Sequence, residues 1–184
     1  MYPSSRRGSV MALLVFGLAV GGCSSAKSSA PPAPQGANPV TWVGAFCSGL
    51  GDAITGQAAF TKTQPSTPQA QKDALLKLAD TTQQSFTSAA SKLTQLGPPA
   101  IPNGKQTQDS AVSFFTTTAA TVSDQRAKLV TLDANDPDFA KKASQLASPN
   151  GNTTTRLQKV TSNPEVMAAF GKAPECQRLA TPTH

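Results

Sequence analysis

Histidine is almost missing from this chain of 184 residues, which has a single one, His184, at the C-terminus. Metal sites draw heavily on histidine as a ligand, and nucleophilic catalysis needs a base beside the serine, cysteine or threonine. A chain end is expected to fray, so His184 is a poor candidate for either role. The sequence therefore predicts no metal, no other cofactor and no catalytic residue, and it favours a protein that is not an enzyme.

Charge is also scarce, at 14% of the residues, and no run of lysine or arginine occurs. Nucleic-acid binding needs a clustered basic face, so we expect no nucleic-acid partner. If residues 1–22 are removed, Arg6 and Arg7 go with them and the net charge falls from +6 to +4. Such a mild excess is typical of a solvated surface, which we expect Thr and Gln to form here more than Glu and Lys.

The N-terminus has the parts of an export signal, a positive start followed by an apolar run over residues 10–20. That run is too short for a good membrane span, which needs about 20 apolar residues. We expect residues 1–22 to be a cleaved signal peptide that uses the general secretory route. Twin-arginine export, which Ser5-Arg6-Arg7 resembles, and an uncleaved membrane helix are the alternatives.

The apolar run ends in Val20-Gly21-Gly22-Cys23, which resembles the bacterial lipobox. The resemblance implies cleavage between Gly22 and Cys23, lipid such as palmitate on Cys23, and a position at the extracytoplasmic face of the cell membrane. Two or three acyl chains on one residue bind a membrane firmly, whereas a single chain binds reversibly. An ordinary secretory signal followed by an incidental cysteine is the alternative.

Two further cysteines, Cys47 and Cys176, remain if Cys23 carries lipid. Conditions outside the cytoplasm are oxidising, and an even pair of cysteines then predicts one disulfide bond. Residues 24–38 consist largely of Ser, Ala and Pro. Together with Cys23 they predict a disordered, lipidated tether over residues 23–38. Residues 39–184 are long enough for one domain.

The pattern of this domain is helical, because apolar residues recur at intervals of 3 and 4 and no useful strand alternation appears. Asn or Asp or Thr followed by Pro, at Asn38, Thr67, Asp136 and Asn163, predicts four helix starts. The fold class is therefore all-α, an antiparallel bundle of four to six helices with a tail over residues 172–176. We expect helices at about 39–62, 68–96, 105–132, 137–147, 153–160 and 164–170.

Inward stripes can be assigned to the long helices. Four glycines weaken the first helix by up to about 1 kcal/mol each, so a neighbouring helix is expected to approach it closely. Trp42, the only tryptophan, is expected in the core, whereas Arg126 should lie near a bundle end or extend its charge to solvent. The stripes are Val43, Cys47, Leu50 and Ile54; Leu75, Ala79, Thr82, Phe86, Ala89, Leu93 and Leu96; Val112, Phe115, Ala119, Val122 and Leu129; and Phe139, Ala143 and Leu146.

The acidic cluster Asp133, Asp136 and Asp138 is the nearest approach to a paired-acid or calcium site. Asp136 is explained as a helix N-cap, and Asp138 suits the positive end of the same helix. A calcium-binding EF-hand loop that starts at Asp133 would place Asp138 where glycine is required and Ser144 where glutamate is required. The cluster thus predicts no catalysis and no metal.

Several motifs together resemble small lipoproteins of mycobacteria and related actinobacteria, a group without an assigned activity. The resemblance implies an envelope location and a helical fold. It rests on the lipobox, the tether, Trp42-Val43-Gly44-Ala45-Phe46-Cys47, Leu96-Gly97-Pro98-Pro99 and Pro174-Glu175-Cys176.

Three functions are consistent with these features. The favoured one is a membrane-anchored binding or assembly module that contacts an envelope protein through a neutral polar face. The second is a carrier of a lipid or other apolar ligand in a cavity between helices, and an envelope hydrolase is the least favoured. A hollow apolar interior would favour the carrier, and a solid interior would favour the binding module. The residues of the expected polar face include Thr81, Gln84, Thr116, Thr117 and Gln125.

Overall fold

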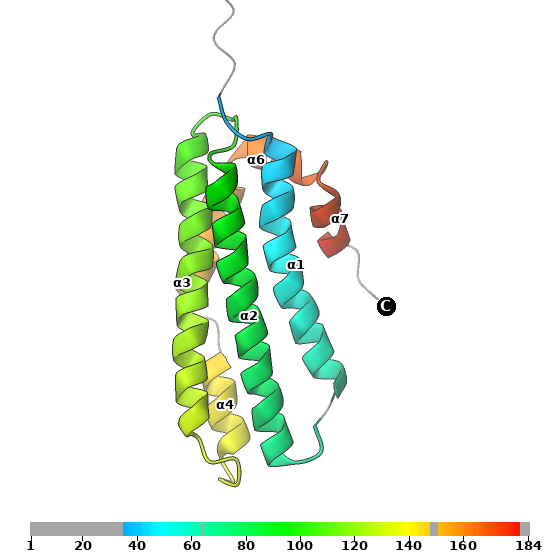
Figure 1. Cartoon of the computed structure of the whole chain (residues 1–184), viewed down its shortest axis with the longest axis vertical. Coiled ribbons are helices and arrows are strands. Elements are labelled where there is room, and N and C mark those ends of the chain that lie inside the picture. The colour runs from blue at the N-terminus through cyan, green and yellow to red at the C-terminus, as the bar shows by residue number, and fades with distance from the viewer. Residues whose placement is uncertain (1–34, 64, 148–150, 181–184) are drawn as a thin grey trace, which may run out of the picture. The chain divides into compact units, whose positions relative to one another are not determined.

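The computed structural model describes residues 35–63, 65–147 and 151–180. Seven α-helices and no strand occur in these ranges, which confirms the all-α prediction and adds one helix to it (Figure 1). Ala33–His184 forms one compact unit, and both core clusters and the disulfide lie within it. The helices are α1 (Pro39–Thr63), α2 (Pro68–Leu96), α3 (Gly104–Thr131), α4 (Phe139–Ala147), α5 (Gly151–Thr161), α6 (Pro164–Phe170) and α7 (Pro174–Ala180).

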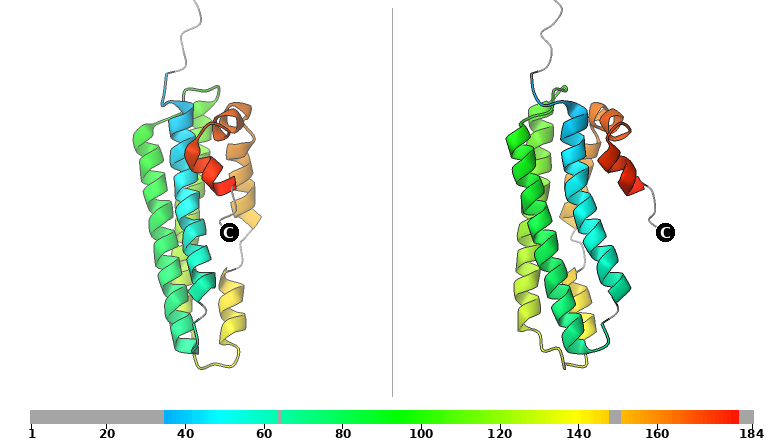
Figure 2. Two further views of the ribbon diagram at one scale, coloured as in Figure 1. Left: turned by 90° about the vertical axis from the view of Figure 1, so that its right-hand side faces the viewer. Right: turned by 45° about the vertical axis from the view of Figure 1, so that its right-hand side comes forward.

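The three long helices run antiparallel, and α2 packs on both α1 and α3. The two short helices α4 and α5 follow one another along the remaining side and together take the place of a fourth long helix (Figure 2). The helix α6 then crosses near the start of α1, and α7 returns along α1. The predicted antiparallel bundle is therefore built from three continuous helices and one interrupted column.

Local sequence signals explain most of the helix starts. The side chain of Asn38 accepts hydrogen bonds from the backbone N–H groups of Val40 and Thr41 at 2.9 and 3.2 Å. Thr67 and Asn163 cap α2 and α6 in the same manner, and proline follows each cap. These three predicted starts are confirmed, since a side-chain oxygen satisfies N–H groups that the helix leaves unpaired.

Two local predictions are wrong. The fourth helix begins at Phe139 and not at Asp136, because Asp136 accepts the N–H of Asp138 and holds residues 136–138 in a turn before the helix. The expected tail after Lys172 contains the helix α7, which is held by the disulfide and by its packing on α1. Both results come from contacts that the helix periodicity does not encode.

The helix α1 is buried on two faces. Val43 and Cys47 of the predicted stripe are buried toward the C-terminal segment, but Ile54 is 57% exposed and its inward placement is wrong. The helix α7 reaches only as far as Gly51, where Leu179 lies, so no helix covers Ile54 one turn further on. The second face of α1 carries Trp42, Phe46 and Gly49 and points toward α2 and α3.

Close approach at Gly49 explains one of the glycines in α1. A Cβ atom at Gly49 would lie 2.3 Å from the Cβ of Ala89 and 3.1 Å from the ring of Phe115. Contacts that short do not occur, so α1 and α2 reach their observed separation only with glycine at this position. The predicted compensation for a glycine-weakened helix is thereby confirmed at Gly49.

The core has two parts. The larger one lies at the end where α1 begins and is rich in aromatic rings, with Phe46 at 5.1 Å from Phe115 and 6.1 Å from Trp42 between ring centroids. The smaller one lies at the opposite end, where Leu129, Phe139 and Ala143 are buried between α3 and α4. The candidate site adjoins the smaller cluster, because Leu129 and Ala143 line it as well.

Candidate binding site

The predicted site residues of the N-terminus, Gly22 and Cys23, lie outside the described residues, as does His184. The predicted disulfide between Cys47 and Cys176 is present, and both cysteines are buried. It joins α1 to α7 across a sequence separation of 129 residues. The bond fastens the C-terminal segment against the aromatic end of the bundle.

The aromatic end of the bundle contains two buried polar residues that the sequence did not mark as buried, Thr107 and Gln108. Trp42 is fully buried, as predicted, and its Nε1–H donates to the Oε1 atom of Gln108. Gln108 in turn donates through Nε2 to the carbonyl oxygen of Leu93. A polar side chain in an apolar core needs such partners, and here they connect α1, α2 and α3.

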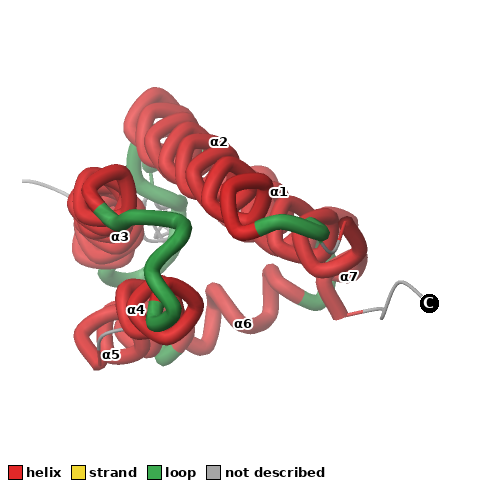
Figure 3. Tube along the Cα trace, turned by 90° about the horizontal axis from the view of Figure 1, so that it is seen from below, coloured by secondary structure: helices red, strands yellow, loops and turns green. Residues whose placement is uncertain are grey.

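The opposite half of the bundle contains a pocket that is partly open to solvent. A cavity of about 200 Å³ opens between α1, α2, α3 and α4, the four elements that surround this region in Figure 3. Its walls are mainly apolar, and no acidic side chain lines it. The apolar lining residues are Leu75, Leu78, Ala79, Val122, Leu129, Ala143 and Leu146, and the polar ones are Gln57, Thr82, Gln125 and Arg126.

Small side chains in the predicted stripe explain the hollow. Between Leu75 and Phe86, the inward stripe of α2 carries only Ala79 and Thr82. The facing part of α3 offers Val122 and then polar residues, so apart from Leu78 these two helices bring no large apolar side chain to this level. The small size of the inward residues Ala79 and Thr82 was therefore the sequence signal for this hollow.

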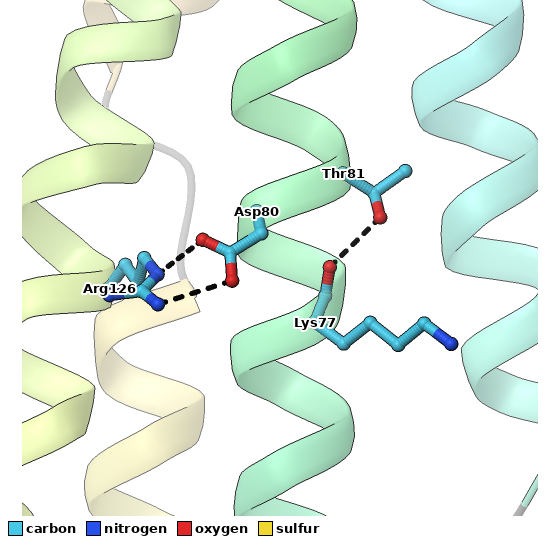
Figure 4. A network of polar contacts seen from close by, with 4 residues as sticks. All are labelled: Lys77, Asp80, Thr81 and Arg126. Atoms are coloured by element: carbon cyan, nitrogen blue, oxygen red, sulfur yellow. Dashed lines mark hydrogen bonds and ion pairs between the residues drawn. The ribbon is translucent and has the colours of Figure 1, made fainter.

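Arg126 lies at the edge of this hollow and is paired with Asp80 of α2 (Figure 4). Its Nε donates to Oδ1 of Asp80, and its Nη2 donates to Oδ2 at 3.2 Å, so the two planar groups meet side by side. The hydrogen bond and the charge of Asp80 raise the pKa of Arg126 further. The guanidinium is half-buried and reaches solvent. Of the two placements expected for Arg126, this is the one in which the side chain extends its charge to solvent.

Some hydrogen-bond donors at the hollow have no acceptor in the described protein and are open to solvent. The pair with Asp80 occupies Nε and Nη2 of Arg126, and in the described ranges Nη1 makes no hydrogen bond. The side-chain amides of Gln57 and Gln125 also have no partner there. An apolar cavity with a few convergent polar groups is the usual form of a small-molecule site.

A second hollow of about 330 Å³ lies between α1 and α2 and is lined by Gly56, Phe60 and Ala74, among others. Leu78 lines this hollow as well as the one beside Arg126. The Leu78 side chain is therefore shared by the two hollows. In this region α1 also diverges from α2, as Figure 1 shows at their lower ends.

The residues expected to form one neutral polar face are dispersed. Thr81 lines the hollow between α1 and α2, Gln125 lines the internal hollow, and Thr116 lies in a groove between α2 and α3. That groove, of about 470 Å³, has no charged lining residue. The hydroxyl of Thr116 donates to the carbonyl of Val112 in its own helix, which leaves a methyl-rich surface.

The acidic cluster is occupied by local contacts. Asp133 accepts the N–H of Asn135, and Asp136 is paired with Lys142 while it accepts the N–H of Asp138. These bonds hold the pKa of the Asp136 carboxyl below its ordinary value, chiefly through Lys142. In the parts of the chain that the structure describes, no three His, Cys, Asp or Glu side chains come together as metal ligands.

Among the described residues, no helix combines the length and the apolar character that crossing a bilayer requires. Comparison with known proteins found no matching family model, no matching curated protein and no matching solved structure.

Proposed function

We propose that this protein is a lipid-anchored lipoprotein on the extracytoplasmic face of a bacterial cell membrane, and that its helical domain works by binding. The pairing of cysteines is the observation that carries the proposal. Cys47 and Cys176 are joined inside the fold, so Cys23 is the one cysteine left, and it stands at the end of the lipobox-like Val20-Gly21-Gly22-Cys23. A disulfide is typical of proteins that fold outside the cytoplasm.

The anchor is tested by replacing Cys23 with serine in the full chain. We expect the intact mass of the wild-type mature protein to exceed that of residues 23–184 by the mass of diacylglycerol and any N-acyl group. The Cys23→Ser variant should lack this addition and leave the membrane fraction or remain uncut. Cys47→Ser is the matched control, since it also removes one cysteine but should keep the lipid. A variant that is cut normally and stays membrane-bound at the wild-type level contradicts the anchor.

The binding role is supported by the kind of sites that the domain offers. Asp133 and Asp136 are engaged in turns and an ion pair, while the α2–α3 groove is neutral and methyl-rich. A tether over residues 24–38 would keep the domain near the membrane and raise its effective concentration for an envelope partner. The groove is the surface that we propose for a protein partner.

Crosslinking in intact cells tests this role. A photoreactive residue at Ser91, inside the groove, should capture one envelope protein reproducibly, and the same residue at Ser144 on α4 should not. Replacing Thr87 and Thr116 by lysine should abolish the capture. Turnover of a cell-wall or lipid substrate by the pure protein, with no partner captured, would overturn the binding role. The carrier of an apolar ligand is the second candidate, because a mainly apolar pocket lies between α1, α2, α3 and α4.

A further inference from the structure

We propose that the hollow between α1, α2, α3 and α4 binds a single unbranched acyl chain, with the carbonyl or carboxylate oxygens of its head group at Arg126 and Gln125. The proposal rests on the binding function above and assigns it a ligand class. It does not depend on the lipid anchor. The volume of the hollow, the polar groups at its edge and the adjoining second hollow each support the proposal.

The size of the hollow fits part of an alkyl chain. A cavity of about 150 Å³ with apolar walls holds one benzene molecule, whereas drug-sized ligands occupy about 300 to 1,000 Å³. At about 30 Å³ for a group the size of a water molecule, the 200 Å³ here admit roughly six or seven methylene groups. Walls of Leu, Val and Ala without an acidic residue suit a hydrocarbon.

The polar groups at the hollow select the head group. Nη1 of Arg126 and the amide of Gln125 can both donate, and neither has an acceptor in the described chain. An ammonium head would find no free anion, because Arg126 already occupies Asp80. An oxygen acceptor satisfies these donors, and a carboxylate forms the stronger bond with a guanidinium. The recognised chemistry is therefore an acyl chain that ends in carbonyl or carboxylate oxygens.

Leu78 sets the depth of the site. Its side chain lines the hollow of about 200 Å³ and also the one of about 330 Å³ between α1 and α2. Truncation of this side chain should join the two spaces and lengthen the chain that fits. A Cβ atom at Gly56 would lie 3.5 Å from Cδ1 of Leu78, so the Leu78 side chain extends toward α1.

The site can be tested by calorimetry on residues 24–184, exported through a cleavable signal so that the disulfide forms without a lipid anchor. This chain contains the whole compact unit Ala33–His184. Saturated fatty acids of 4 to 14 carbons, the matching monoacylglycerols and alkyltrimethylammonium ions are titrated below their micelle concentrations. Affinity for the acids should rise about fourfold per methylene and then level off near eight carbons. The ammonium series should bind at least tenfold more weakly.

Different substitutions test the recognition of the head group and the recognition of the alkyl chain. Arg126→Gln should weaken the acids at least tenfold without changing the chain length at which affinity levels off, and Lys105→Gln, which removes an exposed cation elsewhere on α3, should change neither. Leu78→Ala should move the plateau to longer chains. Ala79→Leu should fill the hollow and remove binding while the protein stays folded by circular dichroism. If Ala79→Leu does not fold, Thr82→Leu replaces it.

The outcomes distinguish a free fatty acid from the acyl chain of a lipid, and the ligand assignment from the binding function. Binding of acids alone assigns free fatty acids, and comparable binding of monoacylglycerols assigns the acyl carbonyl of a lipid; both support the site. Absence of saturable binding by the folded protein, equal affinity for ammonium heads, or a plateau unmoved by Leu78→Ala overturns it. If no acyl chain binds while crosslinking at Ser91 still captures a protein, the ligand assignment fails and the binding function stands.

Discussion

Trp42 and Gln108 share a buried hydrogen bond of 2.6 Å between Nε1 and Oε1, which ties α1 to α3 at the aromatic end of the bundle. The amide of Gln108 continues to the carbonyl of Leu93 in α2, also at 2.6 Å. That carbonyl accepts a second bond, from the N–H of Gly97, where α2 ends. If Gln108 is lost, the carbonyl of Leu93 keeps its bond from Gly97, whereas the indole N–H of Trp42 has no partner left.

We expect Gln108→Leu to lower the free energy of unfolding by about 1–3 kcal/mol, the cost of one buried polar group left unpaired. Denaturant unfolding measures it, with the exposed Gln106→Leu as the control for a change of amide to leucine. In a double-mutant cycle, Trp42→Phe should cost less in the Gln108→Leu background than in the wild type. Equal effects of Gln106→Leu and Gln108→Leu would contradict a structural role for this bond.

Gly49 and Gly56 offer a matched pair within α1. Gly49→Ala should destabilise the fold by about 1–3 kcal/mol, because its Cβ would meet Ala89 at 2.3 Å and overpack the helix interface. Gly56→Ala should stabilise it by about 0.5–1 kcal/mol, since its Cβ meets Leu78 at an ordinary 3.5 Å and alanine favours a helix. Thermal unfolding of the two variants decides the matter, and shifts of the same sign would refute the close approach.

The parts of the fold that the sequence predicts correctly are those fixed by neighbours along the chain. Caps at Asn38, Thr67 and Asn163 depend on two or three residues, and the stripe of α2 depends only on spacing. The disulfide was predictable for another reason, namely the count of cysteines and the expected export. These signals suffice for an all-α class and for most helix bounds.

What the sequence does not predict depends on contacts between distant segments. Ile54 follows the same spacing as Cys47, yet it is exposed because α7 ends one turn short of it. Gln108 reads as a surface residue until its partners in α1 and α2 are known. The hollow required the summed size of side chains from four helices, although Ala79 and Thr82 in the stripe of α2 hinted at it.

Acid should weaken the ion pair between Asp136 and Lys142. The bond to Lys142, and then the one from the N–H of Asp138, hold the pKa of Asp136 below its ordinary value. Its contribution to stability is therefore present above the unfolded pKa, near 3.9, and is lost as the pH falls through the lower folded pKa. Lys142 has a raised pKa, so its part is lost only as the solution becomes strongly alkaline.

Accordingly, Asp136→Asn should lower the melting temperature at pH 7, and its difference from the wild type should shrink as the pH falls below about 4. Asp124→Asn is the control for the loss of one surface carboxylate, since in the described chain the exposed Asp124 makes no side-chain hydrogen bond. A difference between Asp136→Asn and wild type that stays constant from pH 7 to pH 2 would disprove the assigned bond.

The Cys47–Cys176 bond should be the strongest single constraint on the domain. Chain entropy for a closed loop of this length gives about 4–5 kcal/mol as an upper value. Reduction leaves both thiols in place and isolates the cross-link, whereas Cys47→Ala with Cys176→Ala also empties part of the core. We therefore expect both forms to unfold at lower denaturant concentration than the oxidised protein, and the double variant to be the least stable.

The loss should begin in α7. This helix has seven residues and packs mainly on α1, and a helix so short is not stable alone in water. Hydrogen exchange should thus show early loss of protection at α7 in the reduced protein, while the buried amides near Phe115 in α3 stay protected. An unchanged unfolding midpoint on reduction, or uniform loss of protection throughout the bundle, would contradict a fastening role for the disulfide. Wild type kept oxidised in the same buffer is the control.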